Sequence, residues 1–231
     1  MPNPAPSQFH RVEALSLATG LTVLAMVLPY SDAVRNLYRA QFAGDHWLTE
    51  HRFGDVVLIL MGLVLALPAP RDSGLYIGRI REHWKGVVLL TAGPVLITAL
   101  VYPWLPERPF RDADVNMWLT SPLAQDLFFG GVIYRLLRPH FSGRVHPRLP
   151  FEWVLPVGGV FFAAWHLQNL AYFPVRYSCF QLLYTWAGYT VIGLTRQWTG
   201  SFLYVTAAHM TGNFVVWYVD WVGWDPRSMI A

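Results

Sequence analysis

Apolar residues along the chain gather into seven long segments that short polar stretches separate. The segments cover residues 14–30, 55–69, 86–105, 121–137, 151–170, 179–198 and 202–221. A helix that crosses a bilayer needs about 20 mostly apolar residues, and these segments come close to that length. The pattern therefore predicts an all-α, polytopic membrane protein, folded as a bundle of about seven transmembrane helices.

The stretches between these segments predict their connections. Residues 32–54 are polar enough to form a connection, and residues 199–201, Thr-Gly-Ser, predict a tight turn. In residues 71–85 apolar side chains are interspersed among charged ones, which is typical of an interfacial helix that packs on lipid head groups. Pro94 lies in the middle of the third segment and predicts a kink there.

Composition supports the membrane assignment. The chain is 54% apolar, 16% aromatic and 13% charged, whereas about 25% of the residues in a soluble domain are charged. A pI near 9.1 could indicate a nucleic-acid partner, but the Lys and Arg residues lie in short loops between apolar segments, so we expect a lipid bilayer and no nucleic acid. Cys179 is the only cysteine, which excludes an intrachain disulfide and a cysteine-based metal cluster.

The distribution of Lys and Arg predicts an orientation. Of the 17 such residues, ten fall on the amino-terminal side of the membrane and seven on the opposite side. The positive-inside rule therefore predicts a cytoplasmic amino terminus. Residues 14–30 could instead be a signal peptide, but no small-residue cleavage site follows them, so we interpret them as a membrane anchor.

Three of the apolar segments carry polar groups that are costly inside a membrane and therefore candidates for function. Gln125 and Asp126 lie near the start of the fourth segment, before the Gly130-Gly131 pair. His166 lies near the end of the fifth segment, and the seventh contains His209 with Asn213 four residues later, on the same helix face. Under the predicted orientation all of them fall in the outer half of the bundle, which indicates one site.

Other interpretations of these residues remain open. A single intramembrane His or Asn usually bonds a neighbouring helix, and His166 and His209 could also be ligands of a metal or a tetrapyrrole. The stretch His46 to His51, HWLTEH, does not match the His-Glu-x-x-His spacing of zinc proteases. A ligand role for the two histidines is a distant third interpretation, and our prediction is no metal and no cofactor.

The order of these motifs resembles the CAAX protease and bacteriocin-processing family, which also contains the Abi proteins and consists of glutamic-type intramembrane endopeptidases. Its motifs are Glu-Glu-x-x-x-Arg, Phe-x-x-x-His and His-x-x-x-Asn. The second matches at Phe162 and His166, and the third at His209 and Asn213. The flanks LFFGGVIYRLL and GLTRQWTGSFLYVTAAHMTGN are similar to those of the family, so the resemblance covers roughly residues 119–217.

The resemblance implies two regions. Residues 1–118 would form a variable amino-terminal region of about three spans with interfacial segments. Residues 119–231 would form the protease-like core of about four spans. In the family, the first Glu and the Phe-x-x-x-His histidine activate a water, and the last His and Asn stabilise the oxyanion. By this resemblance His166 would help to activate the water, and His209 and Asn213 would stabilise the oxyanion. We expect Phe162 and Gly130 to contact substrate.

The first motif departs from the family pattern at every fixed position. Gln125 and Asp126 stand where the family has two Glu residues, and Gly130 stands where it has Arg. An amide cannot act as a base, so Gln125 cannot take the role of the first Glu. Three explanations stay open: a rearranged site in which Asp126 serves, an inactive relative, or an introduced Glu→Gln change at position 125.

The sequence therefore predicts an intramembrane endopeptidase that cleaves a membrane-anchored peptide, or a carboxyl-terminal sorting tail, with activated water. We expect it in a bacterial inner membrane with its site toward the outer half. The alternative is a catalytically inactive relative that acts as a scaffold or assembly subunit with a partner in a membrane complex.

Overall fold

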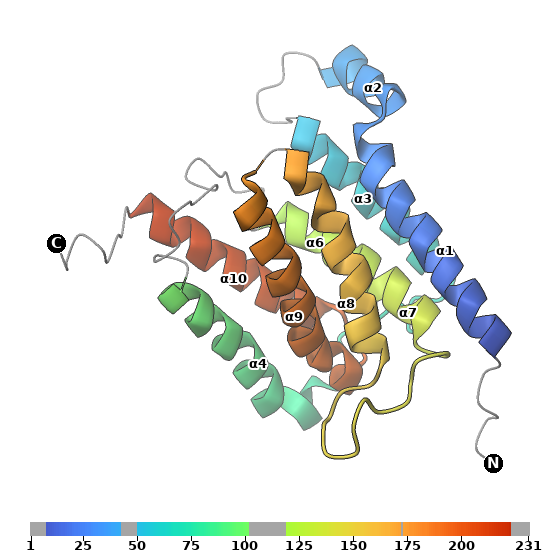
Figure 1. Cartoon of the computed structure of the whole chain (residues 1–231), viewed down its shortest axis with the longest axis vertical. Helices are drawn as coiled ribbons and strands as arrows, with labels where there is room; N and C mark the ends of the chain where they lie inside the picture. Colours follow the sequence, from blue (N-terminus) through green and yellow to red (C-terminus); the bar gives the residue numbers. More distant parts are fainter. Residues whose placement is uncertain (1–7, 43–49, 102–118, 172, 223–231) are drawn as a thin grey trace.

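The computed structural model describes residues 8–42, 50–101, 119–171 and 173–222, and these fold into helices joined by turns and loops (Figure 1). The helices are α1 (Gln8–Val27), α2 (Asp32–Phe42), α3 (Glu50–Ala66), α4 (Ile80–Val101), α6 (Thr120–Asp126), α7 (Tyr134–Leu137), α8 (Val154–Trp165), α9 (Val175–Thr199) and α10 (Leu203–Trp221). The described residues also form the 3-10 helices η1 (Leu28–Tyr30) and η4 (His166–Ala171) and the π-helix η3 (Leu127–Ile133). The predicted all-α class is confirmed.

Each of the seven predicted segments is helical over most of its length in the described part of the chain. Among the described residues, however, none of the helices combines the length and the apolar character that a membrane crossing requires. The seven membrane spans therefore stay a prediction. The division into two regions at residue 118 also stays a prediction. Helices of the two regions pack directly on one another, since α1 contacts α7 and α8, and α3 contacts α6.

Two connections differ from the prediction. Residues 32–54 are not a simple polar connection, because α2 lies within them and α3 begins at Glu50. The interfacial helix expected over residues 71–85 is wrong for residues 71–79, which form a turn over 71–74 and irregular backbone with bends over 75–79. Gly74 and Gly78 interrupt that stretch with φ angles of 77° and 70°, in the left-handed region that helices exclude. Pro94 lies inside α4, which continues as one helix to Val101.

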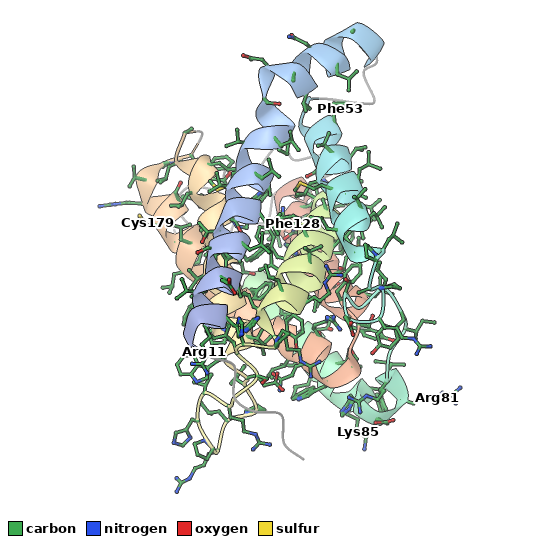
Figure 2. The ribbon with its side chains drawn as sticks, turned by 90° about the vertical axis from the view of Figure 1, so that its right-hand side faces the viewer. Arg11, Phe53, Arg81, Lys85, Phe128 and Cys179 are labelled. Atoms are coloured by element: carbon green, nitrogen blue, oxygen red, sulfur yellow. The ribbon has the colours of Figure 1, made fainter. Side chains whose placement is uncertain are left out.

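The helical stretch α6–η3–α7 is the centre of the fold. Every residue from Ala124 to Tyr134 is buried, and Figure 2 shows Phe128 in the middle of the bundle. A helix that is apolar on all sides has to be surrounded by other elements. Accordingly α6 packs against α3 and α10, and η3 packs against α3 and α8.

Glycines allow α8 and α9 to approach closely. A Cβ atom at Gly193 of α9 would lie 2.8 Å from Leu155 Cδ2 of α8, and one at Gly158 would lie 3.1 Å from the ring of Tyr189. Small residues at helix contacts shorten the distance between backbones. This close packing brings the side chain of Tyr189 to the central helix.

One end of the bundle is basic. Arg11, Arg81 and Lys85 lie at the same end in Figure 2, and Phe53 lies at the other. All three cations belong to the ten that the sequence assigns to one side. How this end is oriented in a membrane stays a prediction.

Candidate active site

Asp126, which is buried, and His209, which is half-buried, form a polar pair between α6 and α10. Asp126 is 1% exposed, and its Oδ2 and Oδ1 atoms lie 3.2 and 3.4 Å from His209 Nδ1. An ionised carboxylate only accepts hydrogen bonds, so the proton of a neutral His209 ring stands on Nδ1. The other ring nitrogen, Nε2, then keeps its lone pair and can accept a proton.

His166 has the same tautomer for a different reason. It begins η4 directly after α8, and its Nδ1 lies 2.9 Å from the carbonyl oxygen of Phe162, one turn earlier. Because a carbonyl oxygen cannot donate, Nδ1–H is the donor and Nε2 of the neutral ring is an acceptor. The imidazole is buried and packs edge-to-face on Trp165, with ring centroids 5.0 Å apart.

The ring of Phe162 joins the two histidines. Its centroid lies 4.9 Å from that of His166 and 5.9 Å from that of His209, and both contacts are edge-to-face. On its other sides the ring packs against Phe129 and Tyr189. The Phe-x-x-x-His motif therefore supplies the side chain that fixes the relative position of both imidazoles. Contact of Phe162 with substrate stays a prediction.

Gln125 is buried beside the pair and only half of its amide is bonded. Its Nε2 donates to Ser121 Oγ at 2.8 Å, and its Oε1 has no hydrogen-bond partner among the described residues. Buried polar atoms are nearly always bonded. The amide oxygen is thus an acceptor available to a donor that enters the site.

The helix that carries Asp126 changes to π geometry immediately after it. π-helical turns are rare and occur frequently at functional sites. Two consecutive carbonyl groups of η3 accept hydrogen bonds from side chains of α9: Phe129 O from Tyr189 Oη at 3.0 Å, and Gly130 O from Arg196 Nε at 3.2 Å. These contacts hold the wide turn against α9.

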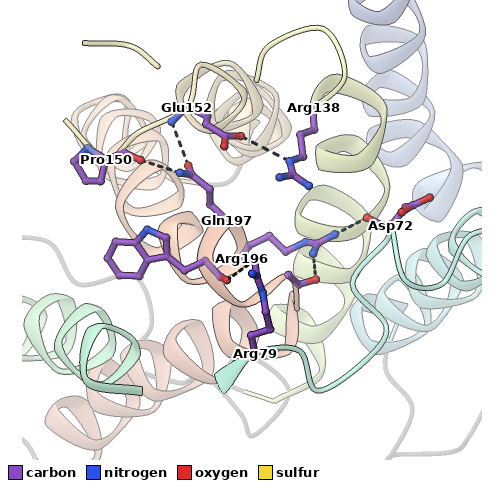
Figure 3. A network of polar contacts seen from close by, with 9 residues as sticks. Asp72, Arg79, Arg138, Pro150, Glu152, Arg196 and Gln197 are labelled. Carbon is purple, nitrogen blue, oxygen red and sulfur yellow. Dashed lines mark hydrogen bonds and ion pairs between the residues drawn. The ribbon is translucent and has the colours of Figure 1, made fainter. Parts of the chain in front are cut away.

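Arg196 is a buried cation that connects three parts of the chain (Figure 3). Besides Gly130 O, its guanidinium donates to the carbonyl oxygens of Asp72 and Gly200, and it lies 4.9 Å from the centroid of the Tyr134 ring. The family motif has an arginine at position 130. Here a guanidinium from another helix binds the backbone of the glycine at that position.

Gly130 itself is surrounded by protein. It is buried, and a Cβ atom there would make an ordinary contact with Phe202 Cβ at 3.6 Å. Asn213 is half-buried on α10, one turn beyond His209 and on the same face. Their predicted roles, in substrate contact and oxyanion stabilisation, stay predictions.

The structure brings together Asp126, Phe162, His166 and His209 from three separate segments. Their roles in a reaction stay predictions. Sequence reasoning missed Tyr189 as a partner of η3, because a tyrosine in an apolar segment carries no specific signal. The sequence analysis counted Arg196 only among the positive charges that predict the membrane orientation.

No group of three or more His, Cys, Asp or Glu side chains in the described part could hold a metal ion. The HWLTEH stretch lies largely outside the described residues, since residues 43–49 are not among them.

Comparison with known proteins gives one family. Residues 114–215 match the model of the Rce1-like family, described as type II CAAX prenyl endopeptidase Rce1-like. The matched region includes every candidate residue from Gln125 to Asn213 and agrees with the resemblance found in the motifs. Comparisons with curated proteins and with solved structures give no match.

Proposed function

We propose that this chain is a membrane-embedded peptidase, because residues 114–215 match the model of the Rce1-like family, described as type II CAAX prenyl endopeptidase Rce1-like. It hydrolyses a peptide bond near the carboxyl terminus of a membrane-anchored protein or peptide. One observation carries the proposal: a buried carboxylate, Asp126, holds the imidazole of His209 at 3.2 Å within the matched region. That pair supplies the base that peptide hydrolysis needs.

The surface of the helices supports a membrane location. Large apolar side chains are exposed on several helices, among them Leu17, Val64, Leu89 and Leu183. Extensive exposed apolar surface marks contact with a membrane or a partner. With the basic end on the cytoplasmic side of a bacterial inner membrane, Asp126 and His166 lie toward the outer half, because α6 begins and α8 ends away from that end.

In the proposed reaction His209 is the general base. Its Nε2 takes a proton from a water molecule, and the water oxygen bonds to the carbonyl carbon of the scissile peptide. The proton then passes from Nε2 to the leaving nitrogen as the C–N bond breaks, which yields a carboxylic acid and an amine. Asp126 keeps the proton of the resting ring on Nδ1 and stabilises the imidazolium, as the aspartate of a Ser-His-Asp triad does.

This assignment differs from the role that the resemblance implies for His209. The family places the carboxylate at position 125, where this chain has an amide, and the contact of Asp126 with His209 supports a rearranged site. Asn213 keeps the oxyanion role, and one well-placed donor of that kind is worth about 10²–10³ in rate. His166 Nε2 and Gln125 Oε1 are two acceptors that can orient the water or a substrate N–H group.

The second candidate is a catalytically silent scaffold or assembly subunit in a membrane complex. It is favoured by Gln125, which has no basicity, and by the absence of the motif arginine at Gly130. The two candidates differ in whether any peptide bond is cut, and one assay separates them.

The assay uses the full chain in liposomes with two fluorogenic substrates, a prenylated CAAX peptide and a peptide with a membrane-anchored sorting tail. The variants are Asp126→Asn, His209→Gln and Gln125→Glu, and Asp72→Asn is the matched control, because Asp72 is an exposed acid. We expect cleavage by the parent and by Asp72→Asn, and a loss of about 100-fold or more with Asp126→Asn or His209→Gln. Cleavage by the Gln125→Glu variant but not by the parent would mean that the glutamine at position 125 inactivates the enzyme. No cleavage by any variant, with a co-purifying partner, would favour the scaffold.

A further inference from the structure

A pocket of about 390 Å³ lies at the start of α4. Two residues of its lining, Arg81 and Lys85, lie at the basic end of the bundle in Figure 2. The pocket is formed by the first turns of α4 and by one residue from the end of α9, and is lined by Arg81, Glu82, His83, Trp84, Lys85, Gly86 and Trp198. None of the candidate active-site residues lines it. It therefore needs its own explanation.

The aromatic wall of this pocket is fixed in place. The Trp198 ring lies against Gly86, where a Cβ atom would come within 2.6 Å of Cζ3, so only glycine leaves room for the ring there. His83 stacks on the same ring at 6.2 Å between centroids and 24° between planes. Arg79 donates to the carbonyl oxygen of Trp198 at 3.4 Å. The aromatic wall of the pocket is thus preformed.

The pocket carries a net positive charge. Arg81 and Lys85 are exposed cations, and Lys85 Nζ lies 5.7 Å from the centroid of the Trp84 ring. Glu82 is the one acid in the lining; its Oε2 lies 3.9 Å from His83 Nε2, and its side chain is 62% exposed. One carboxylate offsets one of the two permanent cations, and His83 adds a further donor. Arg and Lys side chains both commonly bind phosphate groups.

Beyond the pocket the exposed face of α4 becomes apolar. The exposed side chains along it are Val88, Leu89, Leu96, Ile97 and Leu100, and Leu89 is 71% exposed. From Lys85 to Leu100 the helix rises about 22 Å at 1.5 Å per residue. One leaflet of hydrocarbon is about 15 Å thick. The helix thus presents a cationic, aromatic site at one end and an apolar surface long enough for an acyl chain.

We propose that this pocket binds the phosphate head group of an anionic membrane lipid, with an acyl chain of that lipid along the exposed face of α4. The inference rests on the membrane location in the proposed function and is independent of peptide hydrolysis. Trp84 stands where the head group meets the chain, the position that tryptophan prefers at membrane interfaces. Binding at this site anchors α4, which packs on α9 and α10.

The test measures lipid binding to the full chain in nanodiscs by native mass spectrometry, with phosphatidylglycerol or phosphatidylcholine as the added lipid. The pocket variant is Arg81→Gln with Lys85→Gln. Its matched control is Arg144→Gln with Arg148→Gln, two exposed arginines of the loop between α7 and α8. We expect the parent and the control to prefer phosphatidylglycerol. The pocket variant should bind it about 30-fold more weakly, since each Lys or Arg near an anionic surface contributes about fivefold.

Three results would overturn the proposal: equal binding of the two lipids by the parent, an unchanged affinity of the pocket variant, or an equal loss in both double variants. Competition by millimolar inorganic phosphate would show a site for phosphate alone and would overturn the lipid assignment. A chain that does not stay with nanodiscs of either lipid would instead refute the membrane location in the proposed function. Peptide cleavage in the liposome assay is independent of all these outcomes.

Discussion

Replacing Phe162 with leucine tests whether this ring fixes the candidate site. The side chain is 5% exposed and makes ring contacts with Phe129, His166, Tyr189 and His209. Leucine keeps an apolar side chain and the backbone carbonyl that His166 bonds, but loses all four ring contacts. At about 0.5 kcal/mol each, the lower end for aromatic pairs, the loss is about 2 kcal/mol.

For a chain of this length a loss of about 2 kcal/mol lowers the melting temperature by about 4–8 °C. Thermal unfolding in detergent, followed by tryptophan fluorescence, measures the shift. Phe180→Leu is the matched control, because Phe180 is exposed on α9 and should change the melting temperature by less than 2 °C. Equal melting temperatures for Phe162→Leu and the parent would refute a structural role of the ring.

Three further predictions concern the elements around the site. Tyr189→Phe removes the hydrogen bond to Phe129 O and should lower the free energy of unfolding, measured with denaturant, by about 1 kcal/mol. Its control, Tyr184→Phe on the exposed part of α9, should lower it by less than about 0.5 kcal/mol. Equal losses in the two variants would contradict the conclusion that α9 supports η3. Gly200→Ala should destabilise the fold by at least about 1 kcal/mol, because Gly200 has a φ of 80° and a Cβ atom there would clash with Tyr76. Gly188→Ala should be neutral or stabilising, since a Cβ atom meets nothing within 4 Å there and alanine favours the helix. Melting temperatures compare the two glycine variants, and a lower value for Gly188→Ala than for Gly200→Ala would contradict the left-handed turn at Gly200.

The hydrophobic pattern predicts the helices well because burial of apolar residues determines where they form. The fourth segment, residues 121–137, is the clearest case: it is mostly apolar, and the structure surrounds it with other helices. The prediction fails over residues 71–79, where apolar and charged residues alternate as in an amphipathic helix. There Gly74 and Gly78 adopt left-handed conformations, and a Cβ atom at these positions would meet Arg196 and Thr199, which are distant in sequence.

Motif spacing predicts which residues meet at the site and leaves their partners open. The i, i+4 spacing of Phe162 and His166 places both on one face, and the structure shows their rings in contact. Spacing along one helix does not show that Asp126, rather than Gln125, reaches His209, since that depends on how α6 and α10 pack. The contacts of Tyr189 and Arg196 with η3 depend in the same way on the close approach of α9, so sequence patterns do not reveal them.

The rate of peptide cleavage by Asp126→Asn relative to the parent chain tests the central claim most directly. Asparagine keeps the size of the side chain but removes the charge that orients His209 and stabilises its imidazolium. The same change in a Ser-His-Asp triad lowers kcat about 10⁴-fold, so we predict a loss of at least about 100-fold, with Asp72→Asn unchanged. Cleavage by Asp126→Asn at the parent's rate would contradict the account.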